Sequence, residues 1–122
     1  MLTSVRRSTR DKTTAAEGWW VLEGVAVGFI KWWLRPGDLR LSDIEVRPGW
    51  RGRGIAPAMI RAVEARERLP MRSSGSYTPL GFAALAGHLP LVPGTRARTD
   101  TAPMTFVADW DARRPLFPVR GG

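Results

Sequence analysis

Short stretches that alternate between apolar and polar residues fill the first half of the chain, and a helical periodicity follows them. Residues 1–17 lack apolar periodicity, so we expect a basic, flexible lead-in there. Three stretches rich in β-branched and aromatic residues then predict strands, joined by turns at Glu23-Gly24 and Pro36-Gly37-Asp38. The stretches are Gly18–Glu23, Val25–Leu34 and Leu39–Val46. Consecutive strands joined by tight turns favour an antiparallel meander.

A helix is predicted from Gly54 to Arg68, because apolar side chains recur there at the spacing of one helical face. This face consists of Ile55, Met59, Ile60 and Val63. Pro57 fits the first turn, where its missing N–H costs nothing, and Pro70 ends the helix. Glu64 and Arg68 have the spacing and order of a favourable ion pair on the side of the helix that faces water.

The second half of the chain predicts fewer elements. A short strand is expected at Met71–Ser74, a second helix at Pro79–Ala86 after the N-cap Thr78, and a final strand at Met104–Trp110. Residues 113–122 form a basic tail. We therefore predict one domain over residues 18–112, of the α/β class in its α+β form. Its sheet is mixed and mostly antiparallel, with two main helices.

The composition excludes some kinds of catalytic and metal-binding site. The chain of 122 residues has no cysteine and one histidine, His88, so thiolate chemistry is excluded and we predict no metal site. His88 is better explained as a surface or capping residue. In the pairs Trp19-Trp20 and Trp32-Trp33, one ring falls on each face of a strand, and we expect one of each pair in the core.

Positive charge suggests phosphate-bearing partners. The net charge is +8, and arginine greatly outnumbers lysine, which suits bidentate phosphate contacts. GC-rich coding explains the arginine bias equally well, but it does not explain the excess of positive charge. The basic ends are where nucleic acid would be contacted under this interpretation. They contain Arg6, Arg7, Arg10 and Lys12 at the front, and Arg113, Arg114 and Arg120 at the tail.

A glycine-rich turn between the third strand and the first helix carries the most specific signal. Gly52 and Gly54 permit positive φ and leave room beside bare backbone, while the helix start adds free N–H groups and partial positive charge. Arg51 and Arg53 add full charges, so the turn is suited to a diphosphate. The P-loop and dinucleotide-binding patterns are both absent. The alternative is an ordinary strand–helix turn with solvated charges.

The residues of this turn, Arg51-Gly52-Arg53-Gly54-Ile55-Ala56, resemble the R/Q-x-x-G-x-G/A motif of the GNAT superfamily, the Gcn-five-related N-acetyltransferases. The similarity extends back through Asp43-Ile44-Glu45-Val46-Arg47-Pro48, which looks like the family's fourth strand, and forward through the helix. The resemblance implies a GNAT-like sheet with acetyl-CoA as acyl donor. The amides of residues 51–56 would hold its pyrophosphate, and its pantetheine arm would lie between the fourth and fifth strands.

The same resemblance suggests roles in acetyl transfer to an amine. A backbone N–H near Val46 would polarise the thioester carbonyl. Asp43 and Glu45 share one strand face and are candidate bases, although both equally well offset neighbouring arginines. The family has no fixed base, so the resemblance does not choose between them. Tyr77 is the candidate acid for the leaving thiolate, with a packing role as the alternative, because the family's tyrosine usually lies within the second helix.

The front of the chain departs from the family, which has a strand and two helices before its second strand. About 17 residues precede Gly18, so the acceptor site is expected to be open, or completed by partner chains in an oligomer. An open site suits an amine on a protein or on nucleic acid. The alternative is a non-catalytic GNAT-like module that binds nucleic acid or a protein assembly. Such a protein fits a compact bacterial or bacteriophage genome.

Location follows from apolar content. No apolar run approaches the roughly 20 residues that span a membrane, so we expect no membrane contact. We expect a cytoplasmic protein, or one carried in a phage particle under the alternative.

Overall fold

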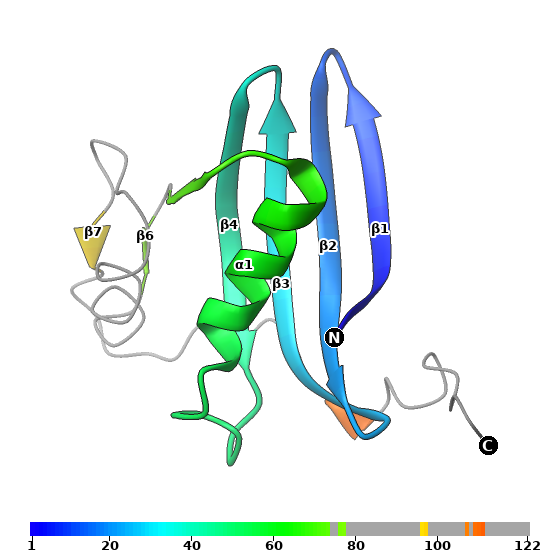
Figure 1. The fold of residues 1–122 in the computed structure, drawn as a ribbon, viewed down its shortest axis with the longest axis vertical. Coiled ribbons are helices and arrows are strands. Elements are labelled where there is room, and N and C mark those ends of the chain that lie inside the picture. Colours follow the sequence, from blue (N-terminus) through cyan, green and yellow to red (C-terminus); the bar gives the residue numbers. More distant parts are fainter. Residues whose placement is uncertain (74–75, 78–95, 98–106, 108, 112–122) are drawn as a thin grey trace.

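The computed structural model describes residues 1–73, 76–77, 96–97, 107 and 109–111. These residues form a five-stranded sheet crossed by one helix, and a separate pair of short strands (Figure 1). The strands of the sheet are β1 (Leu2–Arg10), β2 (Thr13–Leu22), β3 (Val25–Arg35), β4 (Asp38–Val46) and β5 (Met71–Ser73). The helix is α1 (Ile55–Glu67), and the short pair consists of β6 (Ser76–Tyr77) and β7 (Arg96–Ala97).

The five strands lie in the order β1-β2-β3-β4-β5. The first four pair antiparallel with their neighbours in sequence, whereas β5 pairs parallel with β4 after the chain has crossed the sheet through α1. A parallel pair needs such a long connection, so the crossover accounts for the one change of direction. The structure confirms the α/β class and the mixed, mostly antiparallel sheet. It also confirms the predicted strands at 25–34, 39–46 and 71–74 and the helix at 54–68, each to within one residue per end.

The beginning of the chain differs from the expectation. The prediction of a flexible lead-in at residues 1–17 is wrong, because β1 is a strand and β2 begins well before Gly18. Asp11 and Lys12 join the two strands with φ angles of 49° and 66°, and positive φ at both central residues is the pattern of a type I′ hairpin turn. β1 is an edge strand held largely by backbone pairing, and only Leu2 and Val5 pack against the core. Its apolar periodicity is therefore too weak to reveal it.

The main hydrophobic core lies between the sheet and α1, which covers one of its faces (Figure 1). It contains Ala16, Val27, Ile30, Trp32, Leu39, Leu41, Ile55, Met59, Ile60, Val63 and Met71. The opposite face carries a smaller cluster in which Trp19, Ala26 and Phe29 pack with Val107 and Trp110. As predicted, one tryptophan of each pair is buried; the structure shows that these are Trp19 and Trp32, which lie on opposite faces of the sheet.

Two carboxylates fix α1 to the sheet. Glu67 accepts hydrogen bonds from the guanidinium of Arg7 on β1 and, at 3.3 Å, from Nε1 of Trp32 on β3. Glu64 Oε2 accepts a hydrogen bond of 2.8 Å from the backbone N–H of Met71, at the start of β5. The expected ion pair between Glu64 and Arg68 does not form, because the carboxylate turns toward the strand that follows the helix. Both acidic side chains of α1 therefore serve tertiary structure.

Gly28 allows α1 to approach β3 closely. A Cβ atom at this position would lie 2.7 Å from Met59 Sδ and 3.0 Å from Trp20 Cβ. We expect Gly28→Ala to lower the free energy of unfolding by about 1–3 kcal/mol through overpacking. Denaturant unfolding measures this change. In a Met59→Ala background the same substitution should cost clearly less, because only the contact with Trp20 Cβ remains, and an equal cost in both backgrounds would show that the contact with Met59 is not the cause.

Some predicted elements lie outside the described residues, namely the helix at Pro79–Ala86 and the basic tail at 113–122. The strand predicted at Met104–Trp110 is described at three positions, and none of these three residues belongs to a strand. Two of them contribute instead to the smaller hydrophobic cluster. Within the described part of the chain, no helix is long and apolar enough to cross a membrane.

Candidate functional site

β5 pairs with only the first part of its neighbour β4. Their pairing covers three residues of each strand and ends at Leu41 and Ser73, whereas β4 continues to Val46. At the same point the register of β4 with β3 shifts, so that Ser42 is an extra residue, as in a β-bulge. The second half of β4 thus extends beyond the end of β5, with an edge that β5 does not cover.

The direction of the backbone groups along this edge follows from the antiparallel register. Arg47 N–H donates to Val27 O at 2.8 Å, and in an antiparallel pair such bonds involve every second residue. The N–H and C=O groups of Ile44 and Val46 therefore point away from β3, toward the side on which β5 ends. Val46 O accepts a hydrogen bond of 3.2 Å from Arg51 Nε. A ligand placed along this edge would meet backbone donors and acceptors in extended geometry.

The glycine loop follows directly. Gly52 and Gly54 have φ angles of 77° and 75°, and apart from the adjacent residues nothing lies within 4 Å of where a Cβ would stand at either position. The first helical hydrogen bond is that of Ala58 N–H to Gly54 O, at 3.1 Å. In the described part of the chain, the N–H groups of residues 51–56 have no backbone acceptor. The loop therefore presents open backbone donors at the positive end of α1.

Two exposed arginines flank these donors. Arg51 is held through its Nε atom against the end of β4, and Arg53 lies over the ring of Trp50 with its Cζ atom 4.8 Å from the ring centroid. Neither guanidinium forms an ion pair with a described carboxylate. The turn therefore combines backbone donors, a helix terminus and two full positive charges, which together favour a diphosphate.

The two candidate bases share one sheet face, as predicted, but their surroundings differ. Glu45 is buried, with 8% of its surface exposed, and its Oε2 atom accepts a hydrogen bond of 3.1 Å from Val107 N–H. Asp43 is only half-buried and accepts a hydrogen bond of 3.0 Å from Ser42 Oγ. The carboxylate of Glu45 thus helps to hold a distant segment against the sheet, while Asp43 lies beside the bulge and is reachable from solvent.

Arg47 is a structural residue that the sequence did not single out. Its Nη2 atom lies 2.8 Å from Asp111 Oδ1, and its Nη1 atom donates to Ala26 O at 3.3 Å. Together with the hydrogen bond from Val107 to Glu45, this contact holds residues 107 and 109–111 over the face of the sheet that lies opposite α1. A basic residue between the strand and the glycine turn was a visible signal, but its partner is 64 residues away in the chain.

Tyr77 is placed only in part. Its backbone belongs to β6, where it pairs parallel with Ala97 of β7. The helix expected after it lies outside the described residues, as does the position of its side chain. The role of Tyr77 as an acid stays a prediction.

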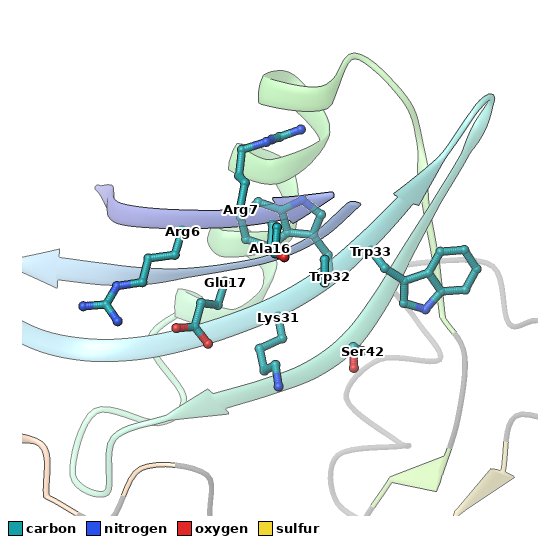
Figure 2. Close-up of a pocket in the computed structure, with 10 residues that line it drawn as sticks. Arg6, Arg7, Ala16, Glu17, Lys31, Trp32, Trp33 and Ser42 are labelled. Carbon is teal, nitrogen blue, oxygen red and sulfur yellow. The ribbon is translucent and has the colours of Figure 1, made fainter. Parts of the chain in front are cut away.

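A shallow hollow of about 420 Å³ lies on the sheet face away from α1. Figure 2 shows Arg6, Glu17, Lys31 and Ser42 projecting on this side, whereas Arg7 points back toward α1. The hollow is lined from β1 to the bulge of β4, so it reaches the part of β4 at which the pairing with β5 ends. A molecule resting there would lie next to the bulge of β4, on the sheet face away from α1.

A model of the acetyltransferase (GNAT) family matches residues 4–70, more than half of the chain. The chain belongs to the GNAT acetyltransferase family. No curated protein matches it significantly. The matched range starts within β1 and contains the bulge of β4, the glycine loop and α1. Proteins of the GNAT family carry out acyl transfer and typically use an acyl-CoA donor, which agrees with a turn suited to a diphosphate.

This GNAT domain keeps the first strand and lacks the helices that usually follow it. The family has two helices between its first and second strands, and the front of this chain was expected to depart from that pattern. In the structure, Asp11 and Lys12 alone connect β1 to β2. The expected shortening of the front is therefore correct in part, because the strand is present. The hairpin leaves the neighbouring sheet face without the wall that those helices would provide.

Proposed function

We propose that this GNAT protein transfers an acetyl group from acetyl-CoA to an amine. One observation carries the proposal: the open N–H groups of residues 51–56 lie directly after the edge of β4 that extends beyond β5. A diphosphate held by the loop leaves its attached chain free to follow this edge. The thioester that acetyl-CoA supplies is then directed toward the bulge at Ser42.

The residues of the chain have distinct tasks in this proposal. The loop amides and Arg53 bind phosphate oxygens, and Arg51 adds a second positive charge. The N–H of Val46 faces the β5 side and is suited to stabilise negative charge on a carbonyl oxygen. Asp43, half-exposed beside the bulge, accepts a proton from the incoming amine. Glu45 is the weaker candidate base, because its carboxylate is buried beneath the segment that contains Val107.

The acceptor is proposed to be an amine on a macromolecule. The turn of two residues between β1 and β2 leaves one side of the site broad, and the hollow on this face is shallow rather than enclosed. A small metabolite needs contacts on most of its surface for specific binding, whereas a protein or nucleic acid brings its own surface. We also propose that the protein acts in the cytoplasm and assembles into an oligomer.

Calorimetric titration of the purified protein with acetyl-CoA, and with free CoA beside it, tests the proposal. We expect both to bind in the micromolar range, on the order of −8 kcal/mol. Release of free thiol from acetyl-CoA in the presence of polylysine or spermidine then tests transfer. Absence of binding at millimolar acetyl-CoA would overturn the proposal.

Replacing Arg51 by alanine is expected to weaken the binding of acetyl-CoA but not the binding of S-acetylpantetheine. Arg51→Ala removes a charge from the diphosphate site but releases Val46 O, which the guanidinium now occupies. We expect acetyl-CoA to bind about tenfold more weakly, as for the loss of one charged hydrogen bond. S-acetylpantetheine, which lacks the diphosphate, should bind the variant at least as well as the unmodified protein. Equal weakening of both ligands in calorimetry would show that Arg51 does not obstruct the strand edge.

A non-catalytic module is the second candidate function, in which the domain binds nucleic acid or a protein assembly, for example in a phage particle. The net charge of +8 and the absent helices favour it. Of the basic residues expected to serve it, Arg7 is already paired with Glu67, while Arg6 and Arg10 are exposed. The titration with acetyl-CoA separates the two functions, since a pure scaffold has no reason to bind the donor.

A further inference from the structure

A group of arginines surrounds Trp33 on the sheet face away from α1, at the end of the sheet remote from the glycine loop. The register places Trp33 of β3 beside Arg40 of β4, and Arg40 in turn beside Arg72 of β5. Arg35 follows Trp33 by two residues and so falls on the same face. We call Trp33, Arg35, Arg40 and Arg72 the arginine cluster. Figure 2 shows Trp33 at the margin of the hollow.

Two of these guanidiniums are held in place without using their terminal nitrogens. The Cζ atoms of Arg35 and Arg40 lie 4.9 Å and 5.1 Å from the centroid of the Trp33 ring, within the range of cation–π contacts. Arg35 Nε donates to Thr13 Oγ1, and Arg40 Nε donates to Asp38 Oδ1, each at 3.2 Å. Their Nη atoms have no acceptor among the described residues. Each side chain is thus positioned at its inner nitrogen while its outer donors remain available.

The cluster also places like charges next to one another. Arg40 and Arg72 are partners in the parallel pairing of β4 with β5, so two like charges lie on neighbouring strands and repel each other. Asp38 forms an ion pair with Arg40 and is also the cross-strand neighbour of Arg35, whereas Arg35 and Arg72, both exposed, form no ion pair with a described carboxylate. A bound anion would offset this repulsion and would accept hydrogen bonds from the free Nη groups.

We propose that the arginine cluster binds the phosphate backbone of single-stranded nucleic acid. Guanidinium forks match phosphate oxygens in two-point contacts, and guanidiniums held by an aromatic ring lose less conformational freedom on binding. The planar guanidiniums also offer surfaces on which unpaired bases stack. The adjoining hollow is open and shallow, which fits a chain that crosses the sheet rather than an enclosed small molecule.

The neighbouring residues limit where the strand can run. The next row across the same face alternates in charge, with Arg6, Glu17, Lys31 and Asp43 as successive partners from β1 to β4. This row is neutral as a whole, so the excess positive charge of the face lies at the end that carries the arginine cluster and Arg10. The hollow lies between the two rows and offers room for bases. The proposal uses none of the residues assigned to acetyl-CoA.

The test is fluorescence anisotropy of a labelled oligothymidine of about 20 nucleotides, titrated with the full-length protein at about 50 mM salt. We expect a dissociation constant in the micromolar range. The double variant Arg35→Gln/Arg40→Gln should bind at least about tenfold more weakly, and its log–log salt slope should fall by about 1.4, corresponding to two lost phosphate contacts. Arg35→Lys/Arg40→Lys keeps the charge but loses the fork, and it should bind at least about threefold more weakly.

The matched control is Arg61→Gln/Arg66→Gln, which removes the same charge from exposed positions on α1, on the other side of the sheet. It should change binding by less than about threefold, and circular dichroism melts should show all variants folded. Equal weakening by both Gln pairs would overturn the proposal, because net charge alone would then explain the binding. Absence of binding, or duplex DNA binding as tightly as the single strand, would overturn it as well. Binding unchanged by Gly54→Glu would support a site separate from the cofactor loop.

Discussion

Replacing Gly54 by glutamate is expected to abolish the binding of acetyl-CoA while the domain remains folded. Gly54 lies at the start of α1 with a φ of 75°, and space is open around the Cβ position. A glutamate there brings a negative charge to the N–H groups proposed to hold the diphosphate. Repulsion and the loss of charged hydrogen bonds should weaken binding by at least about 100-fold. Calorimetric titration measures the loss.

Gly37→Glu is the matched control for this variant. Gly37 lies in the turn between β3 and β4, at the opposite end of β4, with a φ of 72°, and apart from the adjacent residues nothing lies within 4 Å of its Cβ position. Both substitutions place an L-residue in the left-handed region, which costs roughly 1–2 kcal/mol. They should therefore lower the melting temperature alike, while Gly37→Glu retains acetyl-CoA. If Gly54→Glu also retained it, the loop would not be the diphosphate site.

Replacing Asp43 by asparagine is expected to lower kcat for acetyl transfer by about 10²- to 10⁴-fold, the usual contribution of a general base. Asparagine keeps the shape and the acceptor oxygen that Ser42 Oγ contacts, but it does not take up a proton. The affinity for acetyl-CoA should stay unchanged, because Asp43 lies outside the glycine loop. Thiol release with polylysine as acceptor measures kcat, and calorimetry measures donor binding.

Variants of Glu45, the other candidate base, are compared with Asp43→Asn. Glu45→Gln retains an oxygen for the hydrogen bond from Val107 N–H and should therefore keep both turnover and stability. Glu45→Ala leaves that N–H without its partner and should lower the free energy of unfolding by about 1–3 kcal/mol. Should Glu45→Gln abolish transfer while Asp43→Asn remains active, the assignment of the base would be reversed.

The parts of the fold that follow from local pattern were predictable. β3, β4 and α1 each bury one face, so their side chains repeat at the period of a strand or a helix. β1 was not predictable in this way, because an edge strand is held by backbone hydrogen bonds that any side chain permits. Its turn also lacks glycine and asparagine, the residues that usually announce a hairpin, and uses Asp11 and Lys12 instead.

The same distinction between local sequence pattern and long-range contacts applies to the candidate site. Glycines and arginines next to one another identified the loop, since its geometry depends on consecutive residues. The surroundings of the two carboxylates depend on contacts distant in sequence, and the burial of Glu45 under Val107 spans 62 residues. The arginine cluster was missed for a similar reason, because only strand register brings Arg40 and Arg72 together.

The short pairing between β4 and β5 has a consequence for folding and for local motion. The first four strands are joined by turns of two residues, so each strand pairs with the strand next to it in sequence. Closing such short loops costs little conformational entropy. The three pairs of β4 with β5 instead enclose the whole of the glycine loop and α1. We infer that this edge assembles last and opens first, with amide protons of β5 exchanging faster than those of β2 and β3. A donor that bridges the loop and the edge of β4 would then slow that exchange, so hydrogen exchange would report occupancy of the site without any acceptor.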